Sequence, residues 1–342
     1  MHLFSNLLSF FSASIGIDLG TANVLVYVKG RGVVVNEPSY VALDKSTRKV
    51  LAVGSEAKKW ASLGNRDIEI IRPMAQGTIA DYEVSEQMLR YFINRAINHS
   101  VFTQLKVVIA VPYNLNAVNQ RAVKDSAYRA GAQQVELLEE PIASALGVGL
   151  PVGEPGASMI IDMGGGTTEI AVISLGGIVA ADSLPVGGDA LEEAIVKKVE
   201  NDYNLEISHK TAEILKKEIG SAWEMPTEKT FEIKGRDRSN RNLPKAITVT
   251  SQEVREAMMP EFKKMAAGIR KVIGECSPEI SSDLYDRGGA LAGGGALIRG
   301  LDQFLSSETS LPIFVAEEPL YAVVKGTGVK IENTNWNRRT SV

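Results

Sequence analysis

The chain has 342 residues, a length that fits about two domains. Apolar residues make up 44% and charged residues 23%, which is typical of a folded globular protein. Its 37 lysine and arginine residues against 41 aspartate and glutamate residues leave a net charge of −4, so there is no overall positive charge to bind nucleic acid. The single cysteine excludes an intrachain disulfide, the three scattered histidines give no zinc-binding pattern, and no apolar run reaches the roughly 18 residues of a membrane-spanning helix.

Residues 1–12 have the pattern of a short amphipathic helix, with apolar side chains on one face and serine, asparagine and histidine on the other. We expect this helix to lie in a membrane interface, because it is too short to span a bilayer. The expected membrane-facing residues are Leu3, Phe4, Leu7, Leu8, Phe10 and Phe11. Two alternatives remain open: a helix docked on the body of the protein, and a signal peptide, which the lack of lysine or arginine before the apolar stretch argues against.

The next part of the chain alternates between predicted strands and helices. Apolar runs predict strands at 15–18, 24–28, 33–35, 40–43, 50–53, 107–111 and 135–138. Helical periodicity predicts helices at 85–99 and 117–130 and another that begins at 142.

After a linker-like stretch at 151–156, the opening pattern returns. The predicted strands are 159–162, 170–174 and 178–184, and the predicted helices are 190–203, 210–221 and 253–275, with a charged, strand-rich segment at 228–250. Ile17-Asp18-x-Gly20-Thr21 and Ile161-Asp162-x-Gly164-Gly165 each lie between two predicted strands. This internal repeat predicts two α/β domains of similar topology, each a mixed sheet covered by helices.

Three glycine-containing turns follow apolar strands; they begin after Asp18, Asp162 and Leu291. Glycine lets the backbone point its N–H groups at an anion, and an aspartate at the end of a strand can hold the waters of a hard cation. A single turn of this kind is more often a simple hairpin, but two in a repeated context predict that the two domains clamp a polyphosphate. Neither GxxxxGK[ST] nor GxGxxG occurs, which excludes a P-loop and a Rossmann fingerprint.

Seven segments together resemble the actin–Hsp70–sugar-kinase ATPase superfamily and, in detail, the bacterial actins of the MreB type. They are IGIDLGTANVLVYVKGRGVVVNEPS, VVIAVP, LLEEPIASALGVGLP, MIIDMGGGTTEIAVISLGGIV, VGGDALEEAI, TAEILKKEIGSA and LAGGGALIRGL. The resemblance implies an α/β, actin-like ATPase fold of two duplicated ribonuclease-H-like domains around a nucleotide cleft. The implied domains are 13–150, with an inserted subdomain at about 33–75, and 151–330, with one at about 188–260, followed by a tail at 331–342. The chain departs from the family pattern at 59–65, 113–120 and 332–342, outside the phosphate loops.

The resemblance also implies the residues of an ATP and Mg²⁺ site. The implied nucleotide-binding residues are Gly20, Thr21, Ala22, Asn23, Gly164, Gly165, Gly166, Thr167, Gly187, Gly188, Glu213, Lys216, Gly293, Gly294, Gly295 and Ala296. Asp18 and Asp162 would face the water shell of Mg²⁺. Glu140 would orient or deprotonate the attacking water, with Asp162 and Thr167 assisting.

Some of these residues have simpler interpretations. Pro141 is expected to keep Glu140 extended and aimed at the site, but Glu140 could instead be an ordinary helix-start carboxylate, and Glu139 is the alternative catalytic residue. Glu213 and Lys216 could form a solvated ion pair within one helix. Val101 and Phe102 match a loop that helps such filaments enter lipid, or they anchor that loop in the core.

The function implied by the resemblance is a nucleotide-dependent, self-assembling filament protein at the inner face of the cytoplasmic membrane. Slow ATP hydrolysis would weaken the filament, and the filament would scaffold cell-wall elongation with partners such as MreC, MreD and RodZ and so maintain cell shape. An Hsp70-type chaperone is not expected, because no residues remain for a substrate domain, and a sugar kinase lacks a candidate base for its acceptor. A plasmid-partitioning actin is a closer rival, against which the apolar N-terminus argues.

Overall fold

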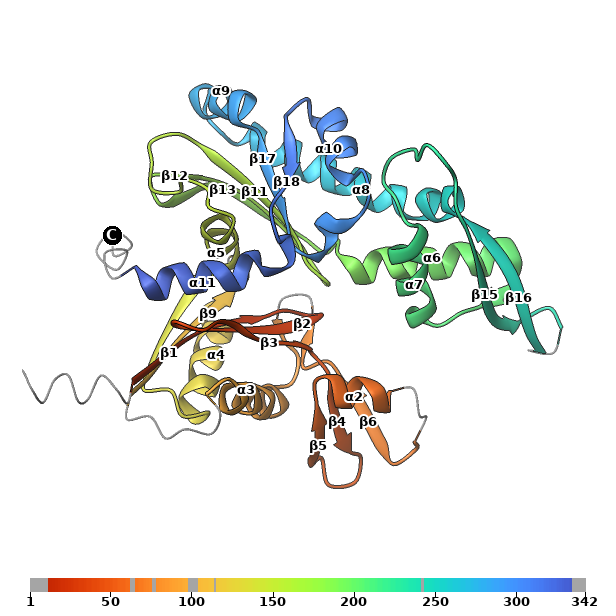
Figure 1. Ribbon diagram of the computed structural model, residues 1–342, viewed down its shortest axis with the longest axis horizontal. Coiled ribbons are helices and arrows are strands. Elements are labelled where there is room, and N and C mark those ends of the chain that lie inside the picture. The colour runs from red at the N-terminus through yellow and green to blue at the C-terminus, as the bar shows by residue number, and fades with distance from the viewer. Residues whose placement is uncertain are drawn as a thin grey trace, which may run out of the picture. The chain divides into compact units, whose positions relative to one another are not determined.

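The computed structural model describes residues 12–61, 65–75, 78–97, 104–113, 115–240 and 243–333. The chain divides into two compact units. The first unit comprises residues 1–154, 174–178 and 320–342, and the second comprises residues 155–173 and 179–319. Each unit is built on one five-stranded sheet with helices packed against it (Figure 1).

The first unit contains most of the elements of the N-terminal half and the last helix of the chain. Its strands are β1 (Ser12–Leu19), β2 (Asn23–Val28), β3 (Gly32–Pro38), β4 (Val41–Asp44), β5 (Val50–Val53), β6 (Ile68–Ile71), β7 (Met74–Ala75), β8 (Thr78–Ile79), β9 (Gln104–Val111) and β10 (Gln134–Glu139). Its helices are α2 (Ser55–Trp60), α3 (Tyr82–Ala96), α4 (Ala117–Arg129), α5 (Glu140–Gly147) and α11 (Ala322–Glu332). A short 3-10 turn, Pro319–Tyr321, precedes α11.

The main sheet of the first unit has the strand order β10-β9-β1-β2-β3. β1 runs parallel to β9 and antiparallel to β2, and β9 runs parallel to β10. Ile15 and Ile17 of β1 share a core with Phe92 of α3, whereas Gly16 lies against Thr327 of α11 on the other face (Figure 1). Along β1, the apolar residues that enter this core therefore alternate with small or polar residues on the face of α11, where the missing side chain of Gly16 leaves room for the helix.

Two smaller sheets complete the first unit. β4 lies between β5 and β6, with α2 packed against them, and β7 pairs with β8. Glu37, at the end of β3, joins α2 to the rest of the unit: its carboxylate accepts a hydrogen bond from the backbone N–H of Ser55 at 2.8 Å and pairs with Arg95 of α3 at 2.9 Å.

The last helix, α11, belongs to the first unit, whereas the sequence prediction extended the second domain to residue 330. Close backbone packing explains this difference. A Cβ atom at Gly326 would lie 1.7 Å from the carbonyl oxygen of Ala143 in α5, and one at Gly147 would lie 1.8 Å from the carbonyl oxygen of Ala322. Only glycine lets the two helices approach this closely, so α11 and α5 pack as one layer.

The second unit contains the repeat of the opening pattern. Its strands are β11 (Ser158–Met163), β12 (Thr168–Ser174), β13 (Gly177–Leu184), β14 (Leu205–Glu206), β15 (Thr230–Asp237), β16 (Leu243–Thr250), β17 (Gly289–Ala292) and β18 (Ile313–Val315). Its helices are α6 (Gly188–Tyr203), α7 (His209–Ile219), α8 (Ser251–Gly274), α9 (Pro278–Arg287) and α10 (Leu301–Thr309), with the 3-10 turn η1 (Gly294–Leu297).

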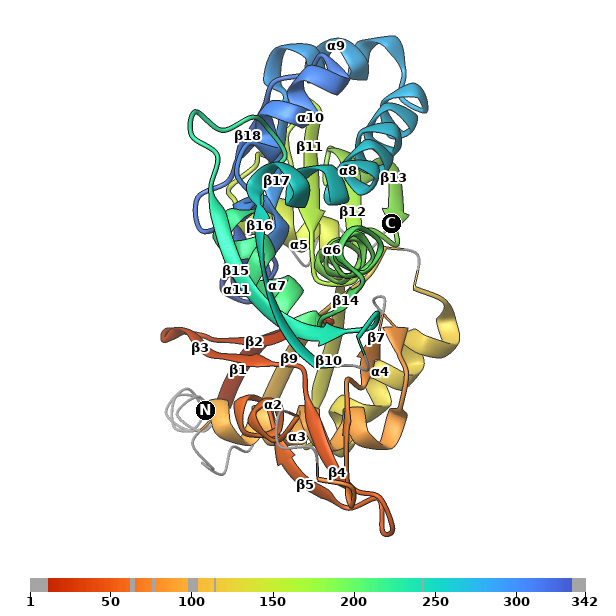
Figure 2. The ribbon, with the colours of Figure 1, turned by 90° about the vertical axis from the view of Figure 1, so that its right-hand side faces the viewer.

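The main sheet of the second unit has the order β13-β12-β11-β17-β18. β11 pairs antiparallel with β12 and parallel with β17, and β17 pairs parallel with β18, which repeats the pairing of β1, β2, β9 and β10. The predicted duplication of one mixed-sheet topology is therefore confirmed. The strand-rich segment is also confirmed: β15 and β16 form a long antiparallel pair, with α7 packed beside β15 (Figure 2).

The residues predicted to contact the membrane are not among those that the structure describes. Leu3, Phe4, Leu7, Leu8, Phe10, Phe11, Val101 and Phe102 all lie outside the described residues. Among the helices that the structure does describe, none has the length and apolar character needed to cross a membrane.

Candidate functional site

The candidate residues of the first unit gather where three parallel strands end. In the register of the sheet, Asp18 of β1 lies opposite Ala110 of β9, and Val111 of β9 lies opposite Glu139 of β10. The first glycine turn follows β1, and Glu140 follows β10. The carboxyl ends of parallel strands are the usual place for ligands in open α/β sheets, and both predicted features of this unit lie there.

The first glycine turn is held in shape by Ser39, a fully buried residue that the sequence analysis did not single out. The Ser39 hydroxyl donates to the carbonyl oxygen of Gly20 at 2.6 Å, and its backbone N–H donates to the carbonyl oxygen of Ala22 at 2.9 Å. A Cβ atom at Gly20 would lie 2.6 Å from the carbonyl oxygen of Asn23, so this tight turn requires glycine. Two hydrogen bonds from Ser39 thus hold the carbonyl groups of this turn.

Glu140 is the first residue of α5, and the extended residue is Glu139, the N-cap, with ψ of 133°. The expectation that Pro141 keeps Glu140 extended is therefore wrong. Proline is tolerated in the first turn of a helix, where its missing N–H has no intrahelical partner, so the helix starts directly at the end of β10. Partial desolvation raises the pKa of the Glu139 carboxyl above its ordinary value.

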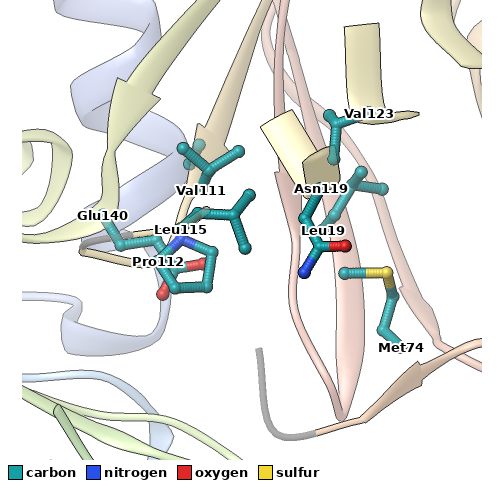
Figure 3. Close-up of a pocket in the computed structure, with 9 residues that line it drawn as sticks. Leu19, Met74, Val111, Pro112, Leu115, Asn119, Val123 and Glu140 are labelled. Carbon is teal, nitrogen blue, oxygen red and sulfur yellow. The ribbon is translucent and has the colours of Figure 1, made fainter. Parts of the chain in front are cut away.

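A small cavity of about 10 Å³ lies beside Glu140 (Figure 3). A cavity of this volume is just large enough for one water molecule. Its lining is apolar except for Glu140 and Asn119, and the Asn119 side chain is oriented by a 2.8 Å hydrogen bond from the hydroxyl of Tyr82. The other lining residues are Leu19, Met74, Ala110, Val111, Pro112, Leu115 and Val123. Glu140 and Asn119 are thus the two polar residues that line a space for a single water molecule near the end of β1.

In the second unit, the loop of residues 164–167 lies on the N-terminus of α6. The backbone N–H groups of Gly188 and Asp189 donate to the carbonyl oxygens of Gly164 and Gly165 at 3.1 and 2.8 Å. A Cβ atom at Gly187 would lie 2.7 Å from the Gly165 oxygen, so any other residue there would push the loop away. The structure thus brings together two of the predicted glycine segments, 164–167 and 187–188.

The third glycine segment, which follows β17, packs against the end of β11. Asp162, which is 7% exposed, pairs with Ala292 across β11 and β17. Gly293 follows with φ of +79°, and a Cβ atom on it would lie 2.5 Å from the Asp162 Oδ1 atom. The turn after Leu291 therefore packs directly on Asp162, as a glycine can and a larger residue cannot.

Lys216 and Glu213 do not pair with each other, so the ion pair that the sequence allowed between them is not formed. The Lys216 ammonium pairs with Glu192 of α6 at 2.6 Å and donates to the carbonyl oxygen of Gly188 at 3.2 Å. The Glu213 carboxylate accepts from Lys217 at 2.5 Å. Lys216 is thus joined to the glycine loops of the second unit. Glu192 went unnoticed in the sequence because its partner lies on another helix.

In each unit taken by itself, the glycine turn and the aspartate before it have the chemistry to contact a phosphate group and a hydrated cation. In each unit the glycines of the turn have no Cβ atom to occupy the space beside the backbone, and the turn follows an aspartate at the end of a strand, Asp18 or Asp162. Among the described residues, no three histidine, cysteine, aspartate or glutamate side chains are close enough to hold a metal by themselves. Mg²⁺ does not need such a cage, because it keeps several waters and is bound through one or two carboxylates and the phosphates of its substrate.

Comparison with known proteins gives the same assignment over nearly the whole chain. The family described as MreB/Mbl protein matches residues 12–339. The chain is 43% identical to the cell shape-determining protein Mbl of Bacillus subtilis strain 168 over 323 residues, which are 94% of this chain and 97% of Mbl. It is also 43% identical to the cell shape-determining protein MreB of Escherichia coli K12 over 327 residues, 94% of each chain.

Solved structures agree with this relationship. The crystal structure of MreB5 of Spiroplasma citri bound to ADP superimposes with a TM-score of 0.91 at 34% identity, covering 96% of this chain and 99% of MreB5. The MamK double helical filament has a TM-score of 0.80 at 21% identity, covering 94% of this chain and 99% of MamK, which shows likeness of fold alone. With its duplicated sheets and glycine turns, the chain has the actin-like fold and belongs to the MreB/Mbl family.

Proposed function

We propose that this protein binds ATP with Mg²⁺, hydrolyses it slowly, and polymerises into membrane-associated filaments that scaffold cell-wall elongation and maintain cell shape. The observation that carries the proposal is the loop of residues 164–167, which lies on the N-terminus of α6 beside Asp162. Glycine turns bind phosphate through their backbone N–H groups, and the N-terminus of α6 holds this turn in place through the carbonyl oxygens of the turn. Nucleotide-bound structures of the similar MreB5, with ADP and with AMPPNP, support the same ligand class.

Each glycine segment has a part in this proposal. Residues 20–23 and 164–167 would bind the phosphates, and Gly187, Gly188, Glu213, Lys216 and residues 293–296 would bind the nucleoside. Asp18 and Asp162 would hold the waters of Mg²⁺. The cation would neutralise the charge of the phosphates, and the backbone N–H groups of the protein would orient them.

For hydrolysis, Glu140 is the residue that would orient the attacking water, with Asp162 and Thr167 assisting. Phosphoryl transfer needs mainly an aligned nucleophile and stabilised oxygens, so a carboxylate that holds one water is enough. The small cavity beside Glu140, lined otherwise by apolar groups and Asn119, supports this role. Glu139 lies at the N-cap and is the competing carboxylate.

The proposed self-assembly is supported by the family relationship, and the membrane role extends the resemblance of the sequence. The curated relatives are named cell shape-determining proteins, and a protein of the same fold forms a double helical filament. We extend this to polymerisation of the present chain on the cytoplasmic membrane through residues 1–12, with MreC, MreD and RodZ as partners. Similarity to cell shape-determining proteins over 94% of the chain favours this function over a sugar-kinase-like or Hsp70-like ATPase without filaments.

Sedimentation with nucleotide tests the proposal. Above a critical concentration the purified protein is expected to pellet with ATP and Mg²⁺ and to stay in the supernatant without nucleotide. Glu140→Ala is expected to bind ATP and pellet normally but to release phosphate about 100-fold more slowly, the usual contribution of a positioned general base. Glu139→Ala is the matched control and should release phosphate at the normal rate.

Three outcomes would contradict parts of the proposal. Absence of heat on calorimetric titration of ATP into folded protein would exclude nucleotide binding. Bound ATP without pelleting, together with phosphorylation of a sugar, would favour the kinase. Loss of phosphate release in Glu139→Ala and not in Glu140→Ala would exchange the roles of the two carboxylates.

A further inference from the structure

The proposed function uses Lys216 of α7 but gives no part to Glu192 of α6, with which Lys216 forms an ion pair. The carboxylate and the ammonium are 2.6 Å apart, and their side chains are only 10% and 13% exposed. The other charged pairs on α6 that involve Glu193 and Lys198 are more exposed. A buried charge is retained only when a partner compensates it, so Glu192 and Lys216 depend on each other.

Lys216 also contacts the backbone at the start of α6. Its ammonium donates to the carbonyl oxygen of Gly188 at 3.2 Å, and a Cβ atom at Gly188 would lie only 3.1 Å from it. The next residue, Asp189, donates its N–H to Gly165, and Gly188 donates to Gly164. The ion pair therefore fixes the turn of α6 on which the candidate phosphate loop lies.

The ammonium of lysine has three N–H donors, and Glu192 and Gly188 use two of them. The third is left with a fixed direction and with its charge already balanced by Glu192. A donor of this kind suits a neutral acceptor, such as a ribose hydroxyl or a ring nitrogen, better than a phosphate oxygen, which a free lysine attracts through its net charge.

We infer that Glu192 is a positioning residue of the nucleotide site and acts through Lys216. It holds the ammonium on Gly188, directs the remaining N–H toward the nucleoside, and keeps the N-terminus of α6 under the loop of residues 164–167. This inference rests on the proposed nucleotide binding and adds to it a residue without which the site is not pre-organised.

A double-mutant cycle measured by calorimetry tests the inference. Glu192→Gln, Lys216→Met and the double variant are titrated with ATP and, separately, with ADP, in the presence of Mg²⁺. Each single change is expected to weaken binding about tenfold, the effect of losing one hydrogen bond to a charged group. The factor is expected to be the same for ATP and ADP, because the nucleoside is common to both, and the double variant is expected to bind no worse than either single variant.

Conservative variants separate positioning from simple structural support. Glu192→Asp keeps the charge on a shorter side chain and is expected to bind more weakly than the wild type but more tightly than Glu192→Gln, which keeps the shape alone. Glu193→Gln, the neighbour in the exposed pair with Lys197, is the matched control and should bind as the wild type does. If Glu192→Gln does not fold, Glu192→Asp carries the test: weaker binding at an unchanged melting temperature supports the inference, and wild-type affinity contradicts it.

Several results would overturn the inference. The first is wild-type affinity for nucleotide in Glu192→Gln. The second is a loss of affinity in the double variant that equals the product of the two single-variant losses. The third is a rise in the affinity for ATP relative to that for ADP in Glu192→Gln, where Lys216 lacks the charge of its partner. Wild-type protein that binds no nucleotide would remove the proposed function as well, whereas wild-type and variant proteins that bind equally would remove this inference alone.

Discussion

At the scale of single residues, the candidate site depends on glycines, because their lack of a Cβ atom leaves room for neighbouring groups. Gly187, Gly293 and Gly20 each lie so close to a neighbouring backbone or carboxylate oxygen that a Cβ atom would come within 2.7 Å of it. Of these, only Gly293 has a positive φ, so at Gly20 and Gly187 the glycine is needed for space and not for its backbone conformation. The glycines were visible in the sequence, but the neighbour that each one accommodates was not.

Gly187→Ala is therefore expected to displace the loop of residues 164–167. We expect nucleotide affinity to fall about tenfold and the free energy of unfolding to fall by about 1–3 kcal/mol, as for other overpacked sites. Calorimetric titration and urea unfolding measure the two quantities. Gly274→Ala, at the end of α8 where nothing lies within 4 Å of the added Cβ atom, is the control and should leave both nearly unchanged. Equal affinities in the two variants would show that the loop does not depend on Gly187.

At the scale of elements, α11 shows what local sequence patterns cannot predict. The helix contains Gly326 and Gly328, which weaken helical propensity, and no helix was predicted there. It forms because its glycines allow contact with α5 and with Tyr27 of β2, and because Lys330 pairs with Glu136 of β10 at 2.9 Å. By contrast, α3, α4, α6 and α8 were predicted within a few residues, since each combines a regular apolar face with a polar face.

The Lys330–Glu136 pair is expected to respond asymmetrically to substitution. The Lys330 side chain is 3% exposed and Glu136 is 35% exposed, with Lys106 as a second cation 3.8 Å away. Glu136→Gln removes one negative charge from beside a buried ammonium and is expected to cost about 2 kcal/mol, whereas Lys330→Met leaves a partly hydrated carboxylate and should cost less than about 1 kcal/mol.

Urea unfolding followed by circular dichroism measures both costs. Lys29→Met, which removes the cation of an exposed pair with Glu332 at 3.7 Å, is the control and should change the free energy of unfolding by less than about 0.5 kcal/mol. A larger cost for Lys330→Met than for Glu136→Gln would mean that α11 is held by the packing of the lysine chain and not by its charge.

At the scale of the whole molecule, the repeated sheet is the main organising feature. Two sheets with the same strand order and pairing each end in a glycine turn that follows an aspartate. This duplication explains why residues far apart in the chain carry one sequence pattern. It also gives each unit its own hydrophobic core.

Deletion of residues 1–11 tests the membrane role of that segment without shortening β1, which begins at Ser12. The truncated protein is expected to lose co-sedimentation with liposomes and to keep its affinity for ATP, because about 0.8 kcal/mol of transfer free energy is lost with each CH₂ group removed from the interface. Phe11→Ser should weaken liposome binding, whereas Asn6→Ser on the polar face should not. Undiminished liposome binding by the truncated protein would reject the anchor.

The sequence by itself determined the duplicated α/β architecture, the three glycine turns and the strand-end aspartates, because hydrophobic periodicity and turn chemistry act over short stretches of chain. Only the tertiary structure decided that Ser39 holds the first loop, that Glu192 pairs with Lys216, that Glu140 begins a helix, and that α11 belongs to the first unit. Each of these depends on contacts between segments distant in the chain or on the way in which one element continues into the next, and such contacts leave no local pattern in the sequence.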